Sequence, residues 1–300
     1  MKDIFIMIKR TFILLLFISL YTSLFAGSFL HLNVREGLSS RQVYQICKDS
    51  TGFIWAYTHM GVDRYDGNEI RHYKLNETID SKDHILSFTV MEIDKEGSLW
   101  IALRNGRIYR YDKLKDCFEL QVDLSQSISF PVLNGIEFEE NGGLWLSTST
   151  GVYYWNRADK VLSPAGLIGE WTNCIIKSAE NTFFVGTNTE VYKMERAGTT
   201  CQLSKEKMDI PVEARIEALF LYGTKLYVGT FSNSAFVIDL ATKQVKSLDS
   251  FIPGIPVRVF AHDGDHSILI GADGAGVFRI DAANETLTEH YIMLRQCFIS

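Results

Sequence analysis

The sequence has little positive charge and few prolines. Its 300 residues include 30 lysines and arginines against 36 aspartates and glutamates, so the formal net charge is −6. Such a chain has no basic field with which to neutralise phosphates, and nucleic acid is therefore excluded as an expected partner. Five prolines and a hydrophobic fraction of 46% are typical of a folded chain rather than a low-complexity one.

The sequence also lacks paired cysteines and the common catalytic motifs. Its five cysteines contain no Cys-x-x-Cys pair, and their odd number and wide spacing predict neither a disulfide framework nor a metal site. No Gly-x-Ser-x-Gly elbow is present. His262 and His266 have metal-ligand spacing for a helix, but "AHDGDHS" is typical of a turn. We therefore expect no catalytic residue, no metal and no cofactor, and do not expect this chain to be an enzyme.

The N-terminal segment differs in composition from the rest. Lys2, Lys9 and Arg10 precede a predominantly apolar run over residues 12–25, and small residues follow it. This order is that of a secretory signal, and the run is shorter than the roughly 20 residues of a membrane-spanning helix. We expect residues 1–28 to be a signal peptide or an N-terminal anchor and the protein to be periplasmic or exported. Membrane contact is expected only through this segment, if it is not cleaved.

A repeat of about forty-three residues runs through the remaining chain. Each copy has an apolar segment, a polar turn, a short aromatic segment, a loop that usually contains glycine, and a further alternating segment. The aromatic segments are "GFIWAYT", "GSLWIAL", "GGLWLST", "NTFFVGT", "TKLYVGT" and "HSILIGA". Their central positions, 39 to 45 residues apart, are Trp55, Trp100, Trp145, Phe184, Tyr227 and Leu269.

Short segments rich in valine, isoleucine and aromatic residues, separated by glycine, aspartate and asparagine, predict β-hairpins. Four antiparallel strands per repeat of this length form the blade of a β-propeller, an all-β fold in which neighbouring blades must stack. The six central positions are therefore expected to pack between blades. The predicted blades cover residues 38–80, 84–125, 131–165, 171–206, 212–250 and 255–294.

The first repeat resembles the two-component regulator propeller family, the periplasmic sensor region of bacterial hybrid two-component systems. The residues that carry the resemblance are Asp49, Gly52, Trp55, Thr58, Gly61, Val62, Arg64, Tyr65 and Asp66. The pattern is strong over residues 29 to about 157 and weaker to about 293. The resemblance implies a ligand-sensing module for an oligosaccharide and a homodimer. The family's kinase and receiver motifs are absent here, so we expect no signalling output domain and a truncated member. A propeller lyase or hydrolase, an interaction scaffold or a degenerate remnant remain alternatives.

The number of strands allows two interpretations of the number of blades. "FLHLNV", residues 29–34, is a further strand-like segment before the first blade. It indicates an incomplete seven-bladed ring, with a six-bladed ring and this segment at its edge as the alternative.

The candidate ligand-binding residues lie in two kinds of loop that a propeller places on one side. These are the loops after the aromatic strands and the connections between blades. Amides and guanidinium groups pair with hydroxyl groups, an aromatic face stacks on a sugar ring, and uronic or sulfated sugars suit the arginines best. The predicted residues are His59, Arg104, Asn105, Trp171, Asn188, Arg215, Asn233, Arg258 and Asp273.

Overall fold

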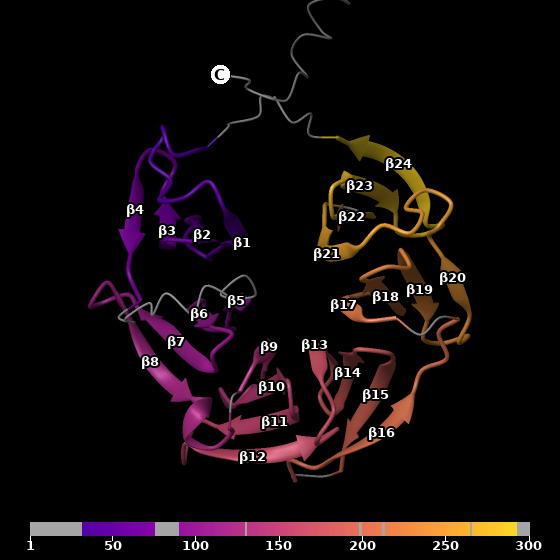
Figure 1. The fold of residues 1–300 in the computed structure, drawn as a ribbon, viewed down its shortest axis with the longest axis horizontal. Helices are drawn as coiled ribbons and strands as arrows, with labels where there is room; N and C mark the ends of the chain where they lie inside the picture. The colour runs from indigo at the N-terminus through magenta and orange to yellow at the C-terminus, as the bar shows by residue number, and fades with distance from the viewer. Residues whose placement is uncertain are drawn as a thin grey trace, which may run out of the picture.

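The computed structural model describes residues 32–75, 90–129, 131–197, 200–211, 214–264 and 266–292. Within these ranges it contains six sheets, each of four antiparallel strands, and one short 3-10 helix, η1 (Leu124–Gln126). The sheets follow one another around a central axis as the blades of a propeller (Figure 1). The prediction of an all-β propeller with six four-stranded blades is confirmed. Among the described residues, no helix has the length and hydropathy needed to cross a membrane.

Every blade runs outward from the axis in chain order, so that its first strand is innermost (Figure 1). The first three blades consist of β1 (Val43–Lys48), β2 (Ile54–Thr58), β3 (Gly61–Tyr65) and β4 (Ile70–Tyr73); β5 (Val90–Ile93), β6 (Leu99–Ala102), β7 (Arg107–Asp112) and β8 (Cys117–Asp123); and β9 (Leu133–Phe138), β10 (Leu144–Thr148), β11 (Gly151–Asn156) and β12 (Val161–Gly166). The last three consist of β13 (Thr172–Ala179), β14 (Thr182–Thr187), β15 (Val191–Arg196) and β16 (Leu203–Lys207); β17 (Ile216–Tyr222), β18 (Lys225–Thr230), β19 (Ala235–Asp239) and β20 (Val245–Ser247); and β21 (Val257–His262), β22 (Ser267–Ala272), β23 (Gly276–Asp281) and β24 (Thr286–Tyr291).

An acidic residue six positions before each tryptophan holds the first hairpin of the first three blades. Its carboxylate accepts a hydrogen bond from the indole Nε1 of that tryptophan. The pairs are Asp49–Trp55 at 2.8 Å, Asp94–Trp100 at 2.7 Å and Glu139–Trp145 at 2.6 Å. In the first two blades the same carboxylate also accepts backbone N–H groups of the turn, from Phe53 and Ser98. The acid therefore satisfies a buried indole donor and closes the turn at once, which the repeat pattern alone did not predict.

The glycine that begins the third strand is required by a close approach of the backbone. Gly61 has a φ of +130°, and a Cβ atom at this position would lie 2.7 Å from the carbonyl oxygen of Tyr73 on the neighbouring strand. No larger residue fits there without moving the strand.

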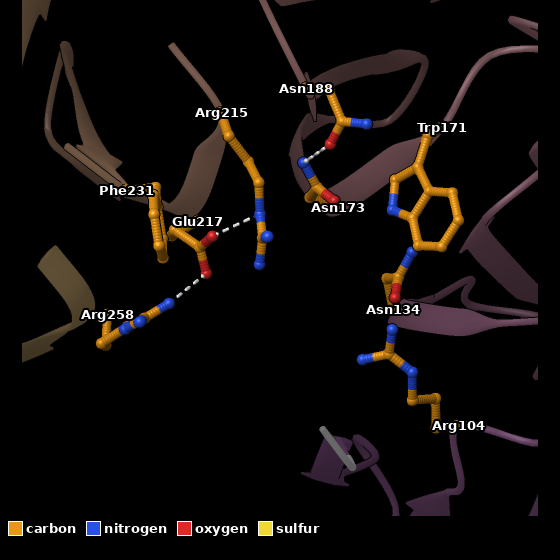
Figure 2. Close-up of a pocket in the computed structure, with 9 residues that line it drawn as sticks. All are labelled: Arg104, Asn134, Trp171, Asn173, Asn188, Arg215, Glu217, Phe231 and Arg258. Carbon is orange, nitrogen blue, oxygen red and sulfur yellow. Dashed lines mark hydrogen bonds and ion pairs between the residues drawn. The ribbon is translucent and has the colours of Figure 1, made fainter. Parts of the chain in front are cut away.

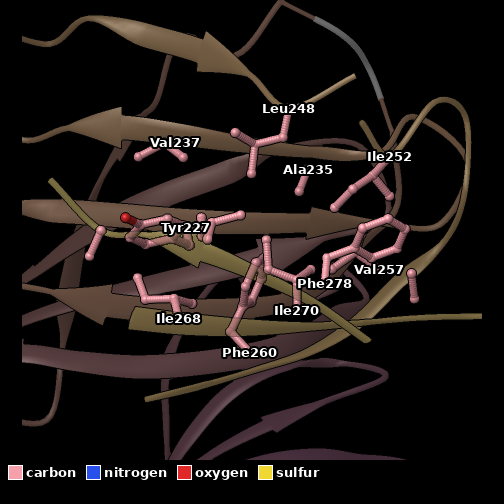
Figure 3. Packing of buried hydrophobic residues seen from close by; sticks show 13 residues of the cluster. Tyr227, Ala235, Val237, Leu248, Ile252, Val257, Phe260, Ile268, Ile270 and Phe278 are labelled. Atoms are coloured by element: carbon pink, nitrogen blue, oxygen red, sulfur yellow. The ribbon is translucent and has the colours of Figure 1, made fainter. Parts of the chain in front are cut away.

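Among the described residues, the apolar core consists of five clusters, each between two consecutive blades. The cluster between the fifth and sixth blades joins Tyr227 to Phe260, Ile268 and Phe278 (Figure 3). Five of the six central positions are at most 2% exposed, as predicted. Leu269 is the exception and the prediction for it was wrong. It is only half-buried, because Ile268 and Ile270 face the fifth blade and Leu269 therefore lies on the opposite, outward face of the last blade.

The first and last blades are separated by a wider interval than neighbouring blades (Figure 1). Of the strand predicted at residues 29–34, only 32–34 are described, and these lie in a loop and a turn rather than a strand. This loop leads to Ser39, which donates from its backbone N to the Asp63 carboxylate at 2.8 Å and thereby lies on the first blade. The predicted signal segment, residues 1–28, lies outside the described residues.

Candidate ligand pocket

A pocket of about 500 Å³ opens at the end of the propeller where the inner strands begin (Figure 2). Its walls come from the second to the sixth blades. The lining residues are Arg104, Asn134, Trp171, Asn173, Asn188, Arg215, Glu217, Phe231 and Arg258. Five of them, Arg104, Trp171, Asn188, Arg215 and Arg258, were predicted from the sequence, and the structure brings these five together.

The other four predicted residues do not line this pocket. His59 lies on the first blade, where its Nδ1 is 3.2 Å from the Tyr44 hydroxyl. Asn105 accepts the backbone N–H of Arg107 in a turn. Asn233 lines a different pocket together with Pro211 and Pro253. Asp273 touches the site only through its ion pair with Arg258.

Four of the lining residues share one position in the repeat. Asn134, Asn173, Glu217 and Arg258 are each the second residue of an innermost strand. The pairing of each of these strands with its neighbour skips that residue, which is therefore the extra residue of a β-bulge. A bulge re-aims one side chain out of the regular alternation of a strand. It explains why four blades send a polar side chain toward the same cavity.

Sequence reasoning missed Asn134, Asn173, Glu217 and Phe231. The first three were passed over because they fall inside predicted inner strands, where side chains are expected to pack between blades. An alignment of the six inner strands would have placed these three residues in one column, since each directly follows the first residue of its strand. Phe231 occupies the loop after β18, beside the predicted Asn233.

One wall of the pocket is a carboxylate held between two arginines. The Glu217 side chain is nearly buried, with Oε1 2.6 Å from Arg215 Nε and Oε2 2.8 Å from Arg258 NH1. Arg258 is also 3.0 Å from Asp273. Both guanidinium groups lie over the ring of Phe231, at 5.1 and 5.2 Å from its centroid. The ion pairs and the aromatic ring together hold the two arginines in fixed orientations.

The opposite wall carries an exposed indole and three amides. Trp171 is 36% exposed and borders the cavity (Figure 2). Asn173 Nδ2 donates to Asn188 Oδ1 at 3.1 Å, and Asn134 Nδ2 donates to the backbone oxygen of Thr172 at 2.7 Å. These hydrogen bonds orient the amides at the cavity wall, beside a flat apolar surface. This is a combination suited to a ring that carries hydroxyl groups.

Arg104 completes the pocket from the second blade. Burial lowers the pKa of its guanidinium, and the positive charge of Arg215 lowers it further. In the described part of the chain, no group of three or more His, Cys, Asp or Glu side chains is arranged to hold a metal ion. The site thus presents guanidinium groups, amides and aromatic rings.

These features define the class of the protein as a β-propeller with a polar pocket at its axis. No protein-family model matches the sequence, and no curated protein matches it. Solved structures do resemble it. The extracellular domain of a hybrid two-component system from B. thetaiotaomicron has a TM-score of 0.70 and 20% sequence identity, over 90% of this chain and 35% of that one.

A second hybrid two-component system of B. thetaiotaomicron has an extracellular domain with a TM-score of 0.67 and 18% identity, over 86% of this chain and 36% of that one. The chain thus spans about a third of the length of these domains. Virginiamycin B lyase from Staphylococcus aureus gives a TM-score of 0.67 and 14% identity, with 85% of each chain covered. Likenesses at such identities show a shared fold. The resemblance to the sensor region of hybrid two-component systems, noted in the sequence, is confirmed at that level.

Proposed function

We propose that this propeller is an exported sensor module that binds an oligosaccharide in the pocket between its inner strands. The observation that carries the proposal is the convergence of Trp171, three amides and three arginines from five blades on one cavity. A cavity of about 500 Å³ falls within the range of about 300–1,000 Å³ that is usual for small-molecule sites. The extracellular location of the similar sensor domains supports an exported protein.

The test is saturable binding by the purified protein on an oligosaccharide array, followed by calorimetry. We expect Trp171→Ala to weaken binding by about tenfold, because the ring loses its stacking surface. Tyr291→Ala is the matched control, since Tyr291 is similarly exposed but lies on β24, away from the pocket. The proposal fails if no oligosaccharide binds saturably, or if the two variants bind alike.

The likeness to virginiamycin B lyase supports a second candidate, a propeller lyase or hydrolase. Glu217 is the carboxylate of the pocket, and it is held in two ion pairs. Incubation of the protein with the oligosaccharides it retains distinguishes the two functions. Intact sugars recovered after saturating binding support the sensor, whereas cleaved products whose formation is lost in Glu217→Gln support the enzyme.

A further inference from the structure

Two guanidinium groups face the same open space of the pocket from opposite sides. Arg104 enters from the second blade and Arg215 from the fifth (Figure 2). They are close enough for the charge of Arg215 to contribute to the lowered pKa of Arg104. Two like charges that face one cavity repel each other, and an anion placed between them converts this repulsion into two attractions.

The contacts of Arg215 leave the terminal nitrogens of its guanidinium group directed at the cavity. Its Nε, rather than its terminal nitrogens, is the atom paired with Glu217, and the terminal nitrogens point toward the pocket in Figure 2. Planar guanidinium forks match carboxylate and sulfate oxygens in pairs, which is the geometry that favours arginine over lysine at such sites. Arg258, in contrast, is already paired with both Glu217 and Asp273.

We infer that the pocket takes an acidic sugar, whose carboxylate or sulfate group lies between Arg104 and Arg215 while a sugar ring stacks on Trp171. This inference rests on the proposed oligosaccharide binding and adds the chemical class of the ligand. Glu217 has a positioning role in it, because its carboxylate turns Arg215 so that the terminal nitrogens face the cavity. The charge of the pocket is thus opposite in sign to the net charge of −6 of the whole chain.

The experiment compares sugars that differ only in their charged group. Trigalacturonate is titrated against its methyl ester, and 6-sulfo-N-acetyllactosamine against N-acetyllactosamine, beside an array of neutral, uronic and sulfated oligosaccharides. We expect an acidic sugar to bind at least about tenfold more tightly than its neutral counterpart, with affinity that falls as salt rises. The first pair reports a carboxylate and the second a sulfate.

Variants locate the charged group. Arg104→Met and Arg215→Met are expected to remove the preference for the acidic member and to retain the weaker binding of the neutral one. Arg279→Met is the control, because Arg279 pairs with Asp263 and Glu289 on the last blade. Arg215→Lys keeps the charge without the fork and should restore only part of the preference, while thermal unfolding verifies that each variant is folded.

Preference for a neutral sugar, on the array or within a pair, overturns the inference and leaves oligosaccharide binding intact. An acidic preference that survives both Met variants overturns the placement between Arg104 and Arg215. If no sugar of any kind binds, the proposed function fails and the inference fails with it.

Discussion

Equivalent strand positions are buried between neighbouring blades but exposed on the outward faces of the first and last blades. Leu144, just before the tryptophan of the third blade, is 0% exposed, whereas its counterpart Ile54 on the first blade is 38% exposed. On the inner strands, Met91 is 1% exposed and the equivalent Ile46 is 66% exposed. The outward face of the last blade shows the same effect at Val259, which is 54% exposed. The side chains are of one kind, so the neighbouring blade, not the strand itself, supplies the burial.

The largest expected loss of stability comes from the buried position in this comparison. Leu144→Ala should lower the free energy of unfolding by about 2–5 kcal/mol, because it opens a cavity between the second and third blades. Ile54→Ala removes a side chain of similar size from the outward face and should cost about 1 kcal/mol or less. Urea unfolding of the two variants measures the difference. Equal losses would show that the first blade is packed against another part of the protein in solution.

The next effect concerns the acid that holds each tryptophan. Asp94→Ala leaves the Trp100 indole N–H, which now donates to the carboxylate at 2.7 Å, without its acceptor. We expect a loss of about 1–3 kcal/mol in unfolding free energy, the usual cost of an unsatisfied buried donor. Asp66→Ala is the control, since Asp66 accepts the backbone N–H groups of Asn68 and Glu69 in an exposed turn. If the two substitutions lower the free energy of unfolding equally, the hydrogen bond to the indole contributes nothing to stability.

The smallest expected effect is a pH dependence from Glu92, an exposed residue on the inner strand β5. Desolvation of its carboxyl group and, second, the charge of Glu137 raise the pKa of Glu92 from 4.5 to about 7. The folded state therefore binds more protons than the unfolded state between these values, and stability falls as pH rises through this window. Glu92→Gln should raise the Tm at pH 8 and change it little at pH 5. Calorimetry at the two pH values measures this, and an equal shift at both would contradict it.

Part of the pocket could be predicted from the sequence because loop positions follow from the repeat. Arg104, Asn188 and Trp171 lie in or beside loops whose places the aromatic strands mark. Asn134, Asn173 and Glu217 could not be found in this way, since they stand within strands. Strict alternation would place them between blades, and only the bulges turn them toward the cavity. Asn233 was misplaced because it lines another pocket, although Phe231 of the same loop lines the ligand pocket.

The sequence by itself determined the repeat and therefore the blade. Strand alternation, turn residues and a bulky side chain every forty-three residues or so are local properties that each repeat carries alone. The tertiary structure decided which faces are covered, because burial depends on the next sheet rather than on the strand that is buried. It also decided the pocket, since residues from Arg104 to Arg258 meet only when five blades are arranged around one axis. Four bulges direct the polar side chains of the inner strands toward this cavity.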